Sequence, residues 1–240
     1  MVQNSKLIFP EISWGIKATL LSVLISLLIP IIASIGLAYI LSKFTAFLPD
    51  YQIAQVYVLI MSFITQIAML ISVWVIAIRG KQSKISSLGI KKPEMSLLLK
   101  FVPLGILLTF LVPVVYAVIR AIFDVEYLQP STLPEVITQN QESLLVFGFM
   151  AIFIAPVVEE IFFRGFVYPS IANRYGVIIS AIATSLLFGL AHIVAANAII
   201  AFFIGLILVY VYHQTTNLMT PILVHSAFNL ISVIIIMVSV

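Results

Sequence analysis

The amino-acid sequence predicts an all-α, polytopic membrane protein, a bundle of about seven transmembrane helices. Of its 240 residues, 62% are hydrophobic and only 9% are charged, and the mean hydropathy is +1.23. A soluble domain carries about 25% charged residues. A water-soluble fold could not hide this much apolar surface, so the composition excludes the soluble classes of protein, and we expect no nucleic-acid partner.

Long apolar runs divide the chain into membrane spans. A helix needs about 20 predominantly apolar residues to cross the hydrocarbon core of a bilayer. We expect spans at residues 14–42, 52–78, 101–123, 143–167, 177–194, 198–212 and 218–240. The first run is too long for a cleaved signal peptide, so we expect it to remain as a transmembrane anchor.

The spans form two parts of one integral membrane domain. Residues 1–142 make an N-terminal half with three spans, and residues 143–240 make a C-terminal core. Residues 79–100 carry six basic side chains against a single acid, Glu94, together with several serines. This composition predicts a loop followed by a short amphipathic segment on the cytoplasmic membrane surface. Residues 124–142 contain four acids and no base, and they are the most water-compatible part of the chain.

Charged residues interrupt the fourth apolar run in the segment from Ala155 to Gly165, Ala-Pro-Val-Val-Glu-Glu-Ile-Phe-Phe-Arg-Gly. Ionisable groups at bilayer depth cost about 2.5–3.5 kcal/mol each on insertion scales and usually mark a function. Glu160 and Arg164 are four residues apart, so they share one helix face and can pair. Glu159 is rotated from Glu160 by about 100° and needs another partner. A structural ion pair therefore explains two of the charges and leaves Glu159 as a functional residue.

Further polar residues lie in the last three apolar runs. His192 follows Phe188 by four residues and shares a helix face with it. Asn229 follows His225 by four residues and shares a face in the same way. The rise of about 1.5 Å per residue places Glu159 and His192 at similar depths on antiparallel helices. One buried histidine is most often a packing residue, but two histidines, a glutamate pair and an asparagine on three helices predict a polar site.

The residue types restrict the chemistry of this site. Cysteine is absent, which excludes thiol catalysis, disulfides and Cys-ligated zinc. The chain has no Gly-x-Ser-x-Gly elbow, no His-Glu-x-x-His motif and no aspartate inside a span. Two mechanisms remain open. In one, a glutamate acts as general base on a water molecule, and histidine and asparagine donate hydrogen bonds to the oxyanion. In the other, Glu159, His192 and His225 hold a divalent metal such as zinc, which acidifies the water.

Three ordered motifs in the C-terminal core resemble those of the CPBP family. They are Glu159-Glu160-x-x-x-Arg164, Phe188-x-x-x-His192 and His225-x-x-x-Asn229. This family groups CAAX proteases with bacteriocin-processing enzymes and is also called the Abi or type II CAAX prenyl endopeptidase family. The resemblance covers about residues 143–240, and the N-terminal half resembles the family only in hydropathy and in its basic segment.

The resemblance implies an intramembrane endopeptidase with a polar cavity that opens toward the cytoplasm. The implied roles are water activation for Glu159 with His192, oxyanion stabilisation for His225 with Asn229, and support of the cavity for Glu160, Arg164 and Phe188. The family was first described as metalloproteases, and a glutamate mechanism without a metal has since been favoured. We therefore expect no required cofactor, with zinc as the alternative.

The substrate does not follow from these residues. We expect a multi-pass protein of the cell membrane that cuts a membrane-associated peptide or protein. The short chain suggests a bacterial origin. The alternative is a non-proteolytic protein of the same fold, either a bacteriocin self-immunity scaffold or a proton-coupled transporter. Transporters often contain two related halves, whereas this sequence shows no internal repeat.

The distribution of basic residues predicts the orientation in the membrane. Lys and Arg favour cytoplasmic loops. With residues 79–100 inside, ten of the twelve basic residues lie on the cytoplasmic side, and only Lys43 and Arg120 lie outside. The N-terminus is then cytoplasmic, and residues 124–142 are external.

Single cysteines test this orientation, because the chain has no cysteine of its own. We expect an impermeant thiol reagent to label Ser131→Cys in intact cells and to leave Ser86→Cys unlabelled until the membrane is permeabilised. The opposite pattern would show that the protein is inserted the other way round.

Overall fold

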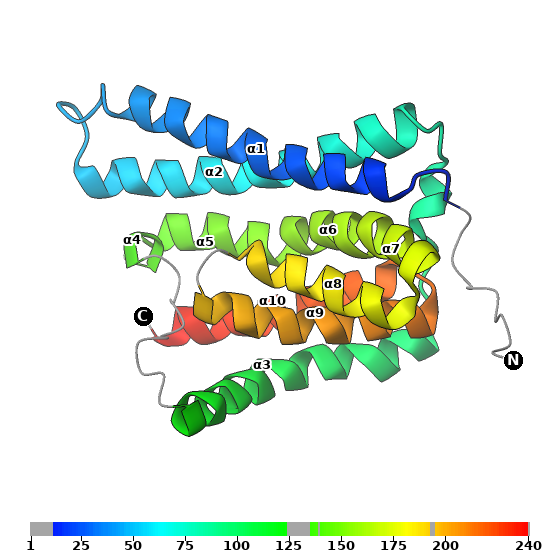
Figure 1. Ribbon diagram of the computed structural model, residues 1–240. Coiled ribbons are helices and arrows are strands. Elements are labelled where there is room, and N and C mark those ends of the chain that lie inside the picture. Colours follow the sequence, from blue (N-terminus) through cyan, green and yellow to red (C-terminus); the bar gives the residue numbers. More distant parts are fainter. Residues whose placement is uncertain (1–11, 124–134, 139, 193–194, 240) are drawn as a thin grey trace, which may run out of the picture.

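The computed structural model is a bundle of long helices (Figure 1). It describes residues 12–123, 135–138, 140–192 and 195–239. Within these ranges the ordered elements are all helices or helical turns, and none is a strand. The all-α membrane bundle that the sequence predicts is confirmed.

The N-terminal half contains three long helices. They are α1 (Ile16–Leu41), α2 (Asp50–Val73) and α3 (Met95–Phe123). A π-helical turn, η1 (Trp74–Arg79), extends α2, and a 3₁₀ turn, η2 (Ile85–Leu88), lies in the connection to α3.

The C-terminal part is built on one continuous helical segment, Gln141–Tyr175, which follows the short helix α4 (Glu135–Thr138). Along this segment lie α5 (Gln141–Phe149), the π-helical turn η3 (Met150–Ile154), α6 (Ala155–Glu160), the π-helical turn η4 (Ile161–Val167) and α7 (Tyr168–Tyr175). Gly176, with a φ of +83°, turns the chain into the next helix. The remaining helices are α8 (Val177–Leu190), α9 (Ala195–Thr215) and α10 (Met219–Ser239).

Six of the described helical segments are long and apolar enough to cross a membrane, and α8, with 14 residues, is a shorter apolar helix. Each predicted apolar run therefore corresponds to one helical segment. The fifth run is the least regular, because α8 ends at Leu190 rather than at residue 194. His192 consequently lies in a turn just beyond the helix end.

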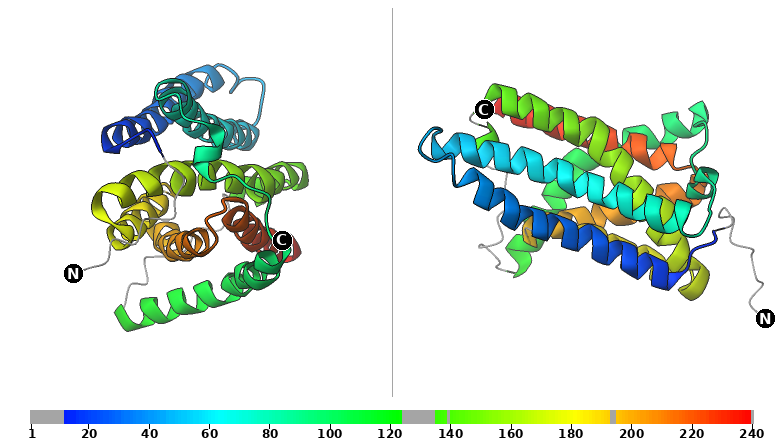
Figure 2. Two further views of the ribbon diagram at one scale, coloured as in Figure 1. Left: turned by 90° about the vertical axis from the view of Figure 1, so that its right-hand side faces the viewer. Right: turned by 90° about the horizontal axis from the view of Figure 1, so that it is seen from above.

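The N-terminal helices cover the C-terminal helices from two sides. The antiparallel pair α1 and α2 packs against one side of the segment from α5 to α7 (Figures 1 and 2). On the opposite side, α3 packs against α10 and α9. Large apolar side chains along the outside of α1, such as Leu20, Ile32 and Ile35, are exposed and suit contact with lipid.

The basic segment 79–100 differs from the amphipathic surface segment that we expected. Residues 95–100 already belong to α3, and the preceding loop is attached to the turn between α9 and α10. The Leu218 N–H donates to the Gly89 carbonyl at 2.9 Å. The Asn217 amide donates to the Lys92 carbonyl at 3.0 Å. These long-range bonds hold the loop against the bundle end, and the local sequence pattern does not encode them.

Most of the basic residues gather at one end of the bundle, as the sequence suggests. The loop with most of the lysines lies at the same end as the turn between α7 and α8 and the turn between α9 and α10 (Figure 1). The α1–α2 connection, which contains Lys43, lies at the other end. The assignment of the lysine-rich end to the cytoplasm stays a prediction.

A close approach between α3 and α10 provides a test of this packing. A Cβ on Gly105 would lie 2.3 Å from the carbonyl oxygen of Val224, the residue before His225. We expect Gly105→Ala to lower the free energy of unfolding by about 1–3 kcal/mol, because the two helices must separate. Thermal unfolding of the purified protein in detergent measures the effect.

Gly36→Ala is the matched control, since nothing lies within 4 Å of a Cβ at that position. It makes the same chemical change in a lipid-facing helix without a steric conflict. Equal melting temperatures for the two variants would contradict the close packing of α3 against α10.

Candidate active site

The segment that carries the glutamate pair is an irregular helix. The short helix α6 lies between the two π-helical turns η3 and η4. Such turns widen a helix locally and often occur at functional sites. In η3 the Ala155 N–H donates to the Met150 carbonyl rather than to the Ala151 carbonyl, which is its partner in a regular α-helix. The next residue, Pro156, has no N–H to donate. The carbonyl of Ala151 therefore lacks its usual intrahelical donors.

Asn229 uses this carbonyl. Its Nδ2 donates to the Ala151 oxygen at 2.7 Å, across the contact between α10 and η3. A carboxamide nitrogen has two N–H groups, so one remains for a ligand in the adjoining cavity. The irregular helix thus sets the orientation of the asparagine that the sequence places in the site.

Glu160 and Arg164 form a fully buried ion pair, as their spacing predicts. The Arg164 guanidinium donates to Glu160 Oε1 at 2.9 Å, and both side chains have an exposed fraction of 0%. A second guanidinium nitrogen donates to the Gly205 carbonyl of α9 at 3.1 Å. The guanidinium also lies 4.5 Å from the centre of the Phe188 ring, where the ring face attracts a cation.

His225 joins this pair. Its Nδ1–H donates to Glu160 Oε1 at 3.1 Å, so one carboxylate oxygen accepts from both Arg164 and His225. The bond fixes the imidazole ring and directs Nε2 toward Glu159, whose Oε2 is 4.0 Å away. The imidazole also stacks edge-on against Phe188, with 5.8 Å between ring centres.

Glu159 has a different environment from its neighbour. Its side chain is 14% exposed, and its Oε1 accepts a hydrogen bond from Gln66 Nε2 of α2 at 3.3 Å. Consecutive helical residues point about 100° apart, so one glutamate is enclosed in the protein while the other faces a cavity. Glu159 is the partly accessible carboxylate of the pair.

His192 approaches the same place from the turn after α8. Its Nδ1–H donates to the Phe188 carbonyl at 2.8 Å, and the two rings are 4.9 Å apart. A neutral imidazole has one donor and one acceptor nitrogen. Because a carbonyl can only accept, Nε2 of the neutral ring is an acceptor that is free for water or substrate.

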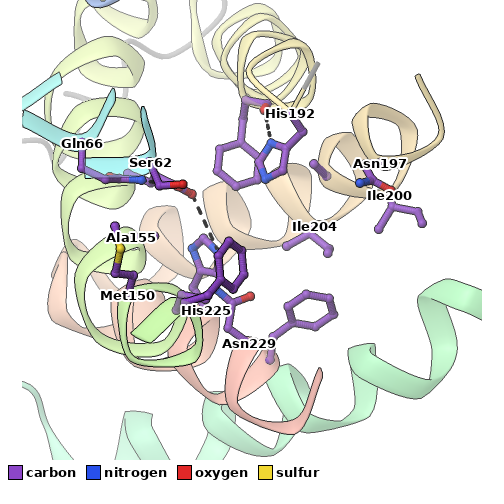
Figure 3. Close-up of a pocket in the computed structure, with 16 residues that line it drawn as sticks. Ser62, Gln66, Met150, Ala155, His192, Asn197, Ile200, Ile204, His225 and Asn229 are labelled. Atoms are coloured by element: carbon purple, nitrogen blue, oxygen red, sulfur yellow. Dashed lines mark hydrogen bonds and ion pairs between the residues drawn. The ribbon is translucent and has the colours of Figure 1, made fainter. Parts of the chain in front are cut away.

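A cavity of about 340 Å³ joins these side chains (Figure 3). Its lining includes all four predicted catalytic residues: Glu159, His192, His225 and Asn229. Phe188 lines it as well, whereas Glu160 and Arg164 lie behind its wall. A second cavity of about 560 Å³ extends toward α1 and α2, and Ser62, Gln66, Glu159 and His192 line both. The predicted set is thus brought together at one place.

The sequence reasoning missed two contributors to this site. Gln66 is an amide in the middle of an apolar run, and such side chains in membrane helices usually bond a neighbouring helix, so its position was a usable signal. Pro156 acts through the missing N–H, and nothing in the sequence pattern reveals the π-helical turn beside it.

A metal site is the alternative that the sequence leaves open. Among the described residues, no three histidine, cysteine, aspartate or glutamate side chains lie close enough together to hold a metal ion. His225 Nδ1 is engaged by Glu160, and His192 Nδ1 is engaged by a backbone carbonyl. Both bonds leave Nε2 of the ring available, which suits a proton-transfer role and also suits a metal ligand.

Comparison with known proteins agrees with this geometry. Residues 141–231 match the family described as type II CAAX prenyl endopeptidase Rce1-like. No curated protein and no solved structure matches the chain. The matched segment begins with α5, ends within α10 and contains all three polar motifs, while α1, α2 and α3 lie outside it. The match supports a relation of this segment to the type II CAAX prenyl endopeptidases, a family of membrane proteases.

Proposed function

We propose that the protein is an intramembrane endopeptidase in which Glu159 activates a water molecule to hydrolyse a peptide bond of a membrane-associated substrate. The observation that carries this proposal is the difference in environment between the two adjacent glutamates. Glu160 is enclosed and neutralises Arg164, while Glu159 lines the cavity with both histidines.

The first step needs a water molecule held against a base. We place the water between a Glu159 oxygen and the free Nε2 of His192. Glu159 takes a proton from this water, and the water oxygen forms a bond with the carbonyl carbon of the scissile peptide. The π electrons of the carbonyl move onto its oxygen, which becomes an oxyanion.

Two groups on α10 can stabilise this oxyanion. The second N–H of Asn229 is free of the Ala151 carbonyl. In its doubly protonated form the His225 ring keeps Nδ1–H on Glu160 and donates Nε2–H to the oxyanion in the same cavity. In the second step the proton on Glu159 passes to the peptide nitrogen, the carbon–nitrogen bond breaks, and the carbonyl is restored as a carboxylic acid. Hydrogen-bond donors that point at the developing negative charge stabilise the transition state far more strongly in a site without bulk water than they would in water.

The family match and the lining of the cavity support a proposal for the substrate class. Besides the polar groups, the wall is apolar and consists mainly of Phe147, Met150, Ala151, Ala155, Ile200, Ala201, Ile204 and Phe228. We propose that it takes an extended, apolar peptide segment close to a membrane anchor. Whether that anchor is a prenyl group is a question for a paired substrate test.

Glu159→Gln tests the base assignment. It preserves shape and hydrogen bonding but removes the proton acceptor, so we expect kcat to fall by at least about 10²-fold. The assay is cleavage of an internally quenched peptide that ends in a prenylated cysteine and three further residues, with its unprenylated counterpart alongside. A well-folded Glu159→Gln protein with full activity would exclude the base role, and a wild-type protein that cleaves neither peptide would exclude this substrate class.

Glu160→Gln is the matched control, with the same chemical change one residue away. It leaves Arg164 without its buried counter-charge, and breaking a buried ion pair costs about 3–5 kcal/mol in soluble proteins. We therefore expect a lower melting temperature and lower yield as its first effects. The contrast between a stable, inactive Glu159→Gln and an unstable Glu160→Gln distinguishes a catalytic from a structural carboxylate.

A chelator tests the proposed metal-free mechanism. We expect a strong chelator to leave cleavage of the quenched peptide unchanged, because the proposed steps use only side chains and water. Loss of activity that added zinc restores would instead assign Glu159, His192 and His225 as metal ligands.

A further inference from the structure

One residue from outside the family-matched segment contacts the proposed base. Gln66 lies on α2, and its Nε2 donates to Glu159 Oε1 at 3.3 Å. This bond joins the N-terminal half to α6 at the centre of the site (Figure 3). Gln66 also lines both cavities, so it stands where they meet.

The environment of the Gln66 amide does not resemble that of a structural glutamine. Its Oε1 is buried and has no hydrogen-bond partner among the described residues. A buried acceptor that is left unpaired carries a desolvation cost. The amide nitrogen of Gln66 donates to Glu159. The side chain therefore keeps an unpaired buried oxygen in the position where its nitrogen holds the carboxylate.

The position of His225 explains why Glu159 needs to be held. Its Nε2 lies 4.0 Å from Glu159 Oε2, a small rotation away from a direct hydrogen bond. Such a bond would turn the carboxylate away from the water and would occupy the nitrogen proposed for the oxyanion. The hydrogen bond from Gln66 instead holds the other carboxylate oxygen, Oε1, toward α2.

We propose that Gln66 is a positioning residue of the hydrolytic site, which holds Glu159 Oε1 and thereby keeps the base apart from His225. The inference rests on the proposed function of Glu159 and adds α2 to the parts of the chain on which the reaction depends. It also makes the family-matched segment incomplete as a catalytic unit.

The effect of Gln66 on proton transfer depends on the other groups around Glu159. His192 faces it from the turn after α8, His225 from α10, and Tyr57 lines the second cavity from α2. Glu160 and Arg164 stand behind it on its own helical segment. Since none of these changes in a Gln66 variant, a shift in the pH profile reports the lost hydrogen bond.

Gln66→Met is the decisive variant, because it keeps the length of the side chain and removes the donor. We expect kcat for the quenched peptide to fall about 10- to 100-fold, as for loss of a hydrogen bond to a charged group, with KM unchanged. The acidic limb of the kcat profile should move to higher pH, and Gln66→Glu should move it further through like-charge repulsion. Wild-type kcat and profile in both variants, or a change in KM alone, would overturn the inference.

Gln52→Met is the matched control. It makes the same change in the first turn of α2, where the amide donates to the neighbouring Tyr51 hydroxyl at 3.2 Å. We expect wild-type kinetics and a wild-type melting temperature. A loss of activity as large as that of Gln66→Met would show that the effect comes from the integrity of α2 and would overturn the inference.

A chemical readout separates this inference from the proposed function. Dicyclohexylcarbodiimide modifies protonated carboxyl groups, and mass spectrometry can follow its reaction with Glu159 as a function of pH without any substrate. We expect Gln66→Met to extend the modification to higher pH than in the wild-type protein. An unchanged curve overturns the role of Gln66, whereas failure of the proteolysis assay with a shifted curve overturns only the proposed function.

Discussion

The buried contact between Glu160, Arg164 and His225 is the constraint on which the site depends. Charges inside a membrane protein are tolerated only when they are paired and hydrogen-bonded. Here one carboxylate oxygen accepts from a guanidinium and an imidazole, and the same guanidinium reaches a carbonyl of α9. The requirement to satisfy these groups fixes α6, α9 and α10 relative to one another. It thereby fixes the neighbouring Glu159 at the wall of the cavity.

The irregular backbone of the helical segment from α5 to α7 is a second feature that shapes the site. A regular helix would satisfy its own carbonyls and offer nothing to a partner. The π-helical turn and Pro156 release the Ala151 carbonyl, which then orients Asn229. A Pro in a membrane helix is tolerated when neighbouring side chains satisfy the freed groups. The irregular backbone therefore explains the orientation of Asn229, and Asn229 satisfies the carbonyl that the irregular backbone leaves free.

The sequence predicts the helices, and it predicts which polar side chains meet at one cavity, because both follow from one-dimensional patterns. Apolar runs give the spans, and polar residues at a spacing of four give the faces. What the sequence does not predict depends on contacts between distant segments. The attachment of the basic loop to the turn between α9 and α10 and the bond from Gln66 to Glu159 are of this kind. Local periodicity carries no signal for them.

The position of α2 has a consequence for how the two parts of the chain relate. The family-matched segment carries Glu159, His192, His225 and Asn229, which line the cavity. Yet Ser62 and Gln66 from α2 line both cavities, so the walls around Glu159 are completed by the N-terminal half. In the mechanism that we propose, the bond from Gln66 holds the Glu159 carboxylate apart from His225. Because Gln66 lies on α2, this mechanism makes the docking of α1 and α2 onto the core a part of assembling the site, besides a covering of apolar surface.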